Sequence, residues 1–203
     1  MAEESTQSPL VDSNLFITVS GPPGCGATTL CDRLSEAMDC PYVSGGQVFR
    51  ELAAERDMNL NQLTAKAEET DEIDRALDGR LRSIAEKWGA ANKAFILESR
   101  LAGWIAGNRA DLRIWLDAPE EVREKRILDR EETTWEMRVR EVSEAGRYQS
   151  YYEIDIEDRK FYDVQLNTAR WGKEAVFDIV RSTIEAYEPD ADEGAFRTDP
   201  PEV

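Results

Sequence analysis

Short apolar runs alternate with longer segments of helical periodicity along this chain. The runs that predict strands cover residues 15–19, 41–43, 94–97, 112–116 and 164–166. An alternation of strands and helices is typical of parallel βαβ units. We therefore predict an α/β protein in three layers, with a five-stranded parallel sheet flanked by helices.

Two segments are longer than one crossover connection requires. Residues 44–90 carry only helical patterns, and Ile73, Leu77, Leu81, Ile84 and Trp88 step by four and three along one long helix, as core packing requires. Residues 131–160 form a charged and aromatic excursion before the last strand. We expect the first segment to bind an acceptor molecule and the second to form a mobile lid.

The two ends of the chain differ from this pattern. Residues 1–13 are polar and acidic, which predicts a flexible N-terminus rather than a secretory signal. Residues 188–203 combine prolines with acids, which predicts a disordered acidic tail. The remaining residues, 14–187, suit a single domain, because a chain of 203 residues can bury one core of that size.

Composition indicates the cellular compartment of the protein. No stretch approaches the roughly 18 uninterrupted apolar residues of a membrane span. Cys25, Cys31 and Cys40 match no disulfide framework, so we expect buried thiols in a reducing, cytoplasmic compartment. We expect a monomer.

The charge is strongly negative, with 42 acidic against 25 basic residues and a net charge of −17. Such a surface repels nucleic acid and anionic lipid, so we expect neither a nucleic-acid nor a membrane partner. Many acids combined with few lysines are also typical of salt-adapted proteins, and we predict a halophilic source. An ordinary acidic protein is the alternative.

A glycine-rich loop directly follows the first predicted strand and opens a helical pattern. Glycines let successive backbone N–H groups point inward, and the helix N-terminus adds partial positive charge, so a polyphosphate fits this loop. The Thr28 hydroxyl stands where Mg²⁺ would be bound. The alternative is a mere tight turn. The residues predicted to bind ATP are Gly21, Pro22, Pro23, Gly24, Cys25, Gly26, Ala27, Thr28 and Thr29.

One residue departs from the phosphate-loop pattern G-x-x-x-x-G-K-[ST]. Ala27 occupies the position of the lysine, which normally contacts the β- and γ-phosphates. Its absence removes a cation from a reaction that depends on charge neutralisation. The loop therefore predicts phosphate binding more strongly than catalysis.

Polar side chains also follow the second and third strands, whose carboxyl ends should face the same crevice. Arg50 and Arg100 could clamp an acceptor phosphate through bidentate hydrogen bonds. Glu98 stands where a carboxylate would hold Mg²⁺ through water. The alternatives are a surface position for Arg50 and an internal salt bridge between Glu98 and Arg100.

Arginines are concentrated after the fourth strand. Asp117-Ala118-Pro119 opens a helix on which arginines recur at spacings of three and four, and more follow in the excursion. They could form a solvated surface neutralised by Glu120, Glu124 and Glu144. A cationic pocket is favoured, because an acidic protein must attract anionic substrates locally. The six arginines are Arg123, Arg126, Arg130, Arg138, Arg140 and Arg147.

Taken together, the motifs resemble those of archaeal cytidylate kinases, in the nucleoside monophosphate kinase superfamily with its P-loop fold. They are the glycine-rich loop, SGGxxFR from Ser44, ESRLAGW from Glu98, the Asp117-Ala118-Pro119 helix and Asn167-Thr168-Ala169-Arg170-Trp171. The resemblance runs from about residue 16 to residue 187. Most members of the family keep a lysine at the position of Ala27.

The resemblance implies an activity and a set of roles. The γ-phosphoryl group of ATP would pass to CMP, or to dCMP, with Mg²⁺. Ser44, Gly45, Gly46, Arg50 and Arg100 would bind the acceptor. Arg126 and Arg130 would reach the ATP, and Arg140 and Arg147 would close from the lid.

Three hypotheses follow. The first is an active kinase, in which catalysis is positioning plus charge neutralisation. The second is a nucleotide-binding paralogue with weak or no turnover, which the alanine at position 27 motivates. The third is a P-loop kinase for a small molecule that is not a nucleotide. The candidate phosphate clamps favour the first.

Overall fold

The structure is a computed structural model that describes residues 14–127 and 134–191, with the backbone alone for residues 134–140. Five parallel strands form one sheet in the order β2-β3-β1-β4-β5. Each strand lies within one residue of its predicted bounds, so the predicted α/β fold is confirmed. The strands are β1 (Phe16–Ser20), β2 (Tyr42–Ser44), β3 (Phe95–Glu98), β4 (Leu112–Asp117) and β5 (Val164–Asn167).

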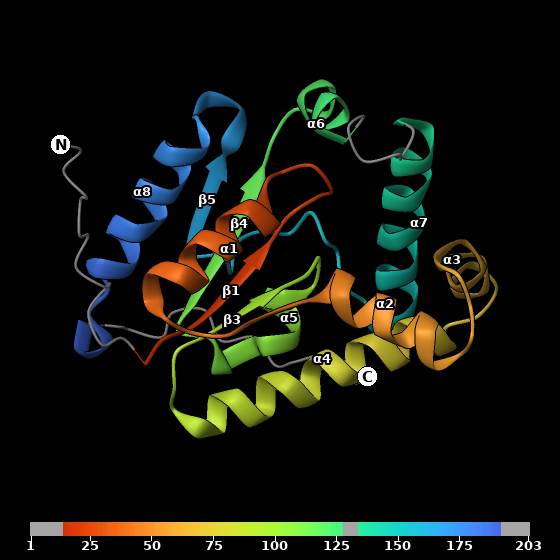
Figure 1. Ribbon diagram of the computed structural model, residues 1–203, viewed down its shortest axis with the longest axis horizontal. Coiled ribbons are helices and arrows are strands. Elements are labelled where there is room, and N and C mark those ends of the chain that lie inside the picture. Colours follow the sequence, from red (N-terminus) through yellow and green to blue (C-terminus); the bar gives the residue numbers. More distant parts are fainter. Residues whose placement is uncertain (1–13, 128–133, 192–203) are drawn as a thin grey trace, which may run out of the picture.

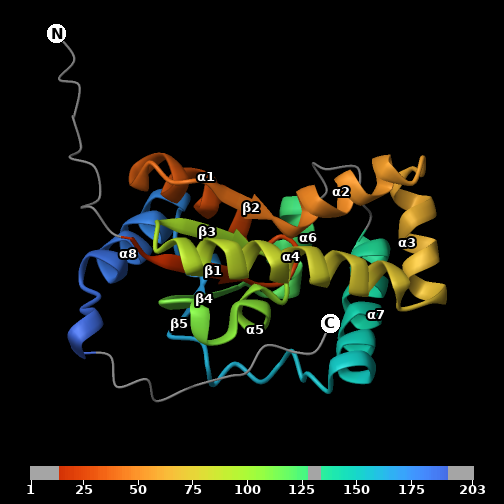
Figure 2. The same ribbon diagram turned by 90° about the horizontal axis from the view of Figure 1, so that it is seen from below.

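Helices cover both faces of this sheet (Figure 1). In both views α2, α3 and α7 gather at the end of the molecule opposite α8 (Figure 2). The α-helices described are α1 (Ala27–Met38), α2 (Gly45–Glu55), α3 (Leu60–Glu69), α4 (Glu72–Ala91), α5 (Ala102–Ala106), α6 (Glu120–Ile127), α7 (Thr134–Tyr152) and α8 (Lys173–Glu185). The short 3₁₀ turns within the described ranges are η1 (Gly107–Arg109), η3 (Thr168–Arg170) and η4 (Pro189–Ala191).

Strand residues alternate between two hydrophobic cores, one on each face of the sheet. Phe16, Phe95 and Trp115 pack with α2, α4 and α5, whereas Ile17 and Ile114 pack with α1 and α8. Successive side chains of a strand point to opposite faces, so a sheet covered on both sides needs apolar residues at nearly every position. This explains why the strands appear in the sequence as continuous apolar runs.

The expected acceptor segment, residues 44–90, forms α2, α3 and most of α4. Asn59 and Gln62 begin α3 with a reciprocal capping box, because each side-chain oxygen accepts a 2.9 Å hydrogen bond from the other residue's backbone N–H. The predicted stripe on α4 packs in the core, and its Trp88 ring stacks on Phe95 at a centroid distance of 4.8 Å.

The expected lid, residues 131–160, consists mainly of α7 and the loop after it; its opening and closing stays a prediction. Of the predicted acidic tail, residues 189–191 form η4, and residues 192–203 lie outside the described residues, as do residues 1–13. None of the helices in residues 14–127 and 134–191 is long and apolar enough to cross a membrane.

Candidate functional site

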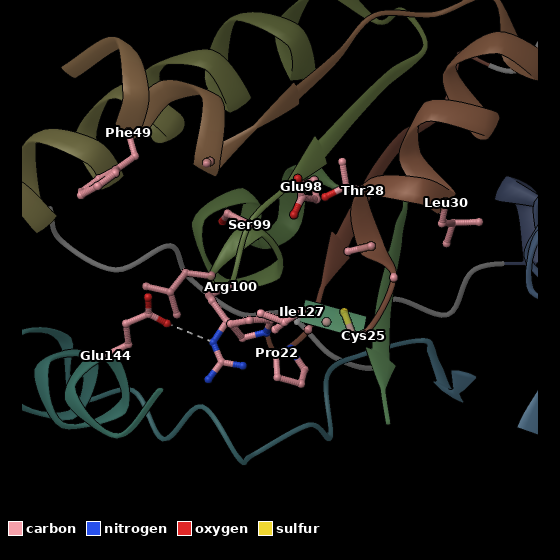
Figure 3. Close-up of a pocket in the computed structure, with 18 of the residues that line it drawn as sticks. Pro22, Cys25, Thr28, Leu30, Phe49, Glu98, Ser99, Arg100, Ile127 and Glu144 are labelled. Atoms are coloured by element: carbon pink, nitrogen blue, oxygen red, sulfur yellow. Dashed lines mark ion pairs between the residues drawn. The ribbon is translucent and has the colours of Figure 1, made fainter. Parts of the chain in front are cut away.

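One cavity of about 730 Å³ joins the two regions that the sequence assigned to different ligands. At one end lies the glycine-rich loop, and all of residues 21–29 line the cavity. At the other end the cavity reaches side chains of α2, α3, α4 and α7, and Figure 3 shows Phe49 and Glu144 on opposite sides of it. The space is therefore continuous from the phosphate loop to the acceptor segment.

The loop is curled in the manner that phosphate binding requires. Gly24 and Gly26 adopt left-handed conformations with φ of 80° and 100°, which favour glycine. The helix α1 begins immediately afterwards, so its unpaired N–H groups and positive dipole end face the loop. An anion in the curl would meet both the loop amides and the helix N-terminus.

Side chains from distant elements hold the loop carbonyls. Arg123 Nη1 donates to the Pro23 oxygen at 3.0 Å, Arg126 Nη1 to the Gly24 oxygen at 3.1 Å, and Thr168 Oγ1 to the Cys25 oxygen at 2.8 Å. In a planar peptide the C=O and the N–H point in opposite directions. Fixing three successive carbonyls therefore also fixes the direction of the amides that an anion would use.

This arrangement refines the interpretation of the arginine helix. Arg123 is buried, and it also bonds the Ala118 oxygen and the Glu141 carboxylate. Arg126 lines the cavity and gives further hydrogen bonds to Thr168. Both arginines therefore support the loop, and contact of Arg126 with ATP stays a prediction. Arg130 lies outside the described residues, as do the side chains of Arg138 and Arg140.

Oxygen ligands suited to Mg²⁺ lie beside the loop. Register pairs Glu98 at the end of β3 with Val19 of β1, and the Glu98 carboxylate is directed toward Thr28 in Figure 3. A carboxylate and a hydroxyl fit a hard cation that keeps most of its water and phosphate ligands. No cluster of three or more acidic, cysteine or histidine side chains that could hold a metal occurs in the described part of the chain. Thr28 and Glu98 thus remain the candidates.

Arg100 lies in the cavity wall and pairs with the lid helix. Its Nε is 3.4 Å from Glu144 Oε2 of α7, and both side chains are largely buried (Figure 3). The alternative salt bridge with Glu98 is not found among the described contacts of Arg100. A guanidinium in this position can reach a phosphate placed between the two ends of the cavity.

The start of α2 presents backbone to the same cavity. Gly45 and Gly46 line it, and a Cβ on Gly45 would lie 2.8 Å from Ser99 Cβ, so only glycine permits this close approach. Ser44 is buried just before the helix. Arg50 is exposed, and its Nη1 is 3.7 Å from the position of a Cβ on Gly46. Gly45 and Gly46 therefore form the cavity wall at this point, while Ser44 and Arg50 flank them without lining the cavity themselves.

Arg147 connects the lid helix to the acceptor segment. Its Nε donates to Asp74 Oδ2 of α4 at 2.5 Å. One turn further along α4, Asp78 Oδ2 accepts a 2.8 Å hydrogen bond from the Tyr152 hydroxyl. Burial raises the pKa of Asp74, and it raises the pKa of Asp78 to about 7. The acceptor end therefore contains a carboxyl group that titrates near neutral pH.

Asp74, Asp78 and Thr168 were not predicted as site residues from the sequence. A signal for the two aspartates exists, because both fall on the face of α4 that also carries Leu77 and Leu81. Acidic residues on an apolar helix face are unusual enough to indicate a site. Thr168 carries no such signal.

The three cysteines are buried and free, as predicted. Burial raises the pKa of the Cys25 thiol in the loop to about 12, so this thiol is neutral at physiological pH. The loop cysteine is therefore a small packing residue rather than a nucleophile.

Comparisons with known proteins agree with this geometry. A family described as an AAA domain matches residues 17–149. Shikimate kinase from Bacteroides thetaiotaomicron shares the fold at a TM-score of 0.59, with 14% identity over 84% of this chain and 98% of that chain. A gluconokinase from Sinorhizobium meliloti 1021 shares the fold at a TM-score of 0.57, with 12% identity over 85% of this chain and 92% of that chain. The fold and the glycine-rich loop thus define a P-loop protein with the same fold as these kinases.

Proteins with similar sequences identify the family within this class of P-loop proteins. Proteins named cytidylate kinase from Haloquadratum walsbyi, Halobacterium salinarum and Pyrococcus furiosus are 53%, 46% and 41% identical to this chain. The matches cover 89–90% of this chain and 94–95% of those proteins. The chain belongs to the cytidylate kinase family. The first two relatives come from halophilic archaea, in agreement with the salt adaptation inferred from composition.

Gly24→Ala should destabilise the loop more than Gly26→Ala. Both residues have positive φ, so each alanine costs about 1–2 kcal/mol in backbone conformation. At Gly24 the new Cβ would also lie 2.8 Å from the Arg123 carbonyl oxygen, whereas at Gly26 nothing lies within 4 Å. Thermal unfolding of the two variants measures the difference, and equal melting temperatures would contradict this account of the loop.

Asp78→Asn should stabilise the protein, and more so as the pH rises from about 4 to about 7. The folded-state pKa is about 7 against 3.8 in the unfolded chain, so ionisation of Asp78 opposes folding in this range. The effect levels off above pH 7, with an upper limit of about 4 kcal/mol. Besides Tyr152, the charged groups facing Asp78 are Asp74, Glu144 and Arg147. Melting temperatures across the range test this; a difference that is independent of pH would contradict it.

Proposed function

We propose that this protein transfers the γ-phosphoryl group of ATP to CMP, or to dCMP, with Mg²⁺. The observation that carries the proposal is the single cavity that joins the phosphate loop to the acceptor segment, with Arg100 in its wall. The family adds the acceptor, since its named members are cytidylate kinases. The geometry adds the means of placing two phosphate-bearing ligands end to end.

The chemistry needs little more than positioning and charge. An oxygen of the acceptor phosphate attacks the γ-phosphorus in line, a P–O bond forms, and the bond to the β-phosphate oxygen breaks to release ADP. No general base is required, because the attacking phosphate is already anionic. The loop amides would bind the ATP phosphates, while Arg100 and Arg50 would hold the acceptor phosphate.

Mg²⁺, when bound, would neutralise charge on the phosphates, and Thr28 and Glu98 would hold it. Ser44, Gly45 and Gly46 would border the acceptor phosphate. Arg126 would support the loop and reach the ATP from it. Arg130 would also reach the ATP. Arg140 and Arg147 would act from the lid, and closure of α7 would exclude water and so suppress ATP hydrolysis.

Features of the chain also support proposals for its oligomeric state, its compartment and its partners. Both ends of the cavity are formed by one chain, so we propose a monomer. The reduced, buried cysteines and the nucleotide substrates fit the cytoplasm. The net charge of −17 leaves nucleic acid and anionic membranes as unfavourable partners.

Purified protein should release ADP from Mg-ATP in the presence of CMP or dCMP at high salt. UMP and AMP should support less turnover, and omission of the acceptor should reduce ADP release to the background. A coupled ADP assay with the four acceptors measures this. The absence of acceptor-dependent ADP with all four nucleotides would refute the proposal of a nucleoside monophosphate kinase. The hypothesis of a P-loop kinase for a small molecule that is not a nucleotide would then be tested.

The rival hypothesis, a nucleotide-binding paralogue with weak turnover, is favoured by one observation. Ala27 lines the cavity where a lysine would meet the phosphates. Arg126 does not simply replace it, because Arg126 already bonds the loop carbonyls and Thr168. Calorimetric binding of ATP without turnover would support the paralogue.

Ala27→Lys should raise kcat by about 10-fold or more, because it restores a cation near the transferred phosphoryl group. Ala27→Met is the matched control, since it adds similar length and volume without charge. Steady-state kinetics with Mg-ATP and CMP compare the two variants. Equal rates in the lysine and methionine variants would show that the missing charge does not limit turnover.

A further inference from the structure

The acceptor end of the cavity carries a feature that phosphate binding does not use. The residues that would hold the acceptor phosphate lie around the start of α2 and the loop after β3, yet α4 extends the cavity wall well beyond them. Along this wall lie Asp78 and Asp74. The part of the acceptor that would reach these two aspartates can be inferred if the protein has the function proposed above.

Positions on α4 give a scale for the acceptor. A Cβ on Gly45 would lie 3.6 Å from Leu81 Cδ1, so Leu81 marks the level of the start of α2, where the acceptor phosphate would bind. At 1.5 Å per residue, Asp78 lies about 4.5 Å and Asp74 about 10 Å further along the helix axis. A nucleotide with its phosphate at Gly45 and Arg100 would extend its base to the level of these aspartates.

The walls at that level suit a flat base. Phe49 of α2, Ala67 of α3 and Leu77 of α4 line this part of the cavity, and Thr64 adds a hydroxyl. Aromatic and aliphatic surfaces can sandwich any base, so they give affinity without selecting one. Selection requires a polar atom with a fixed direction among them.

Asp78 supplies such an atom. Asp78 is 3% exposed and lines the cavity. Oδ2 is occupied by the Tyr152 hydroxyl, whereas Oδ1 has no hydrogen bond among the described residues. Asp74 differs, because its carboxylate already pairs with the Arg147 guanidinium. Among the described residues, Asp78 therefore combines an available acceptor oxygen with the absence of an ion pair of its own.

We propose that Asp78 determines the base specificity of the acceptor site by accepting a hydrogen bond from the 4-amino group of cytosine. Uracil carries a carbonyl oxygen at the same ring position, so two acceptors would face each other in a buried site. Carboxylates accept from the cytosine amino group in the same way when proteins recognise bases in nucleic acids. Tyr152 is the positioning residue that directs the carboxylate.

The free-energy cost of burying the Asp78 carboxylate in the ligand-free protein supports a role for it in binding. Burial raises the pKa of Asp78 to about 7, so its charge opposes folding at neutral pH. Asp74 and Glu144 add to the rise, while Arg147 and the Tyr152 hydrogen bond oppose it. An amino donor from the ligand would stabilise the charged form. A group that destabilises the fold and lines a ligand cavity is typical of a functional site.

Asp78→Asn tests the proposal. The amide oxygen can still accept from cytosine, and the new NH₂ group can donate to the uracil carbonyl, so discrimination should relax. We expect the ratio of kcat/KM for CMP to that for UMP to fall by about 10-fold or more, mainly through improved use of UMP. An unchanged ratio in a folded variant that still phosphorylates CMP would overturn the proposal.

Two further variants make the test decisive. Tyr152→Phe removes the orienting hydroxyl without altering a cavity-lining residue, and should lower the same ratio by a smaller factor. Asp74→Asn breaks the ion pair with Arg147 and should lower activity on both acceptors while leaving the ratio unchanged. If Asp78→Asn fails to fold, an unchanged ratio in Tyr152→Phe overturns the proposal.

Failure of the proposed function is a separate outcome. Wild-type protein that phosphorylates neither CMP nor UMP would refute the kinase assignment itself. The base preference could then still be read from binding, by the shift in melting temperature that CMP and UMP give with the wild type and with Asp78→Asn. A wild-type shift that is no larger for CMP than for UMP would overturn the role of Asp78.

Discussion

The function of this protein depends on how its phosphate loop is held before any ligand arrives. Three loop carbonyls accept hydrogen bonds from Arg123, Arg126 and Thr168, which come from α6 and η3. These bonds turn the peptide planes so that the amides are available to an anion. In a chain with a net charge of −17, attraction of a polyphosphate depends on such local groups.

The arginines at the other end of the cavity are already paired. Arg100 pairs with Glu144, and Arg147 pairs with Asp74, so α7 is connected both to the loop after β3 and to α4. A phosphate that binds Arg100 must therefore compete with a carboxylate rather than with water alone. If the acceptor binds as proposed, it would share these cations with α7, which would link acceptor binding to the position of that helix.

Much of the fold could be predicted because it depends on local pattern. Both faces of the sheet are covered, so its strands are continuous apolar runs and their bounds were found to within one residue. The site was predictable where a motif gathers residues in sequence, as in residues 21–29. Thr168 and Arg123 could not be found in this way, because their partners lie 100 or more positions away in sequence. The arginine spacing indicated a cationic face but not that Arg123 would be buried against the loop.

The sequence by itself determined the strand and helix order, the phosphate loop with its missing lysine and the acidic surface, since each rests on neighbouring residues or on composition. Only the tertiary structure decided that the phosphate loop and the acceptor segment form one cavity, because β3 lies between β1 and β2 and brings Glu98 and Arg100 beside the loop. It also decided which charges are paired and which are available. Pairing depends on the packing of α4 against α7, and no pattern along the chain records that contact.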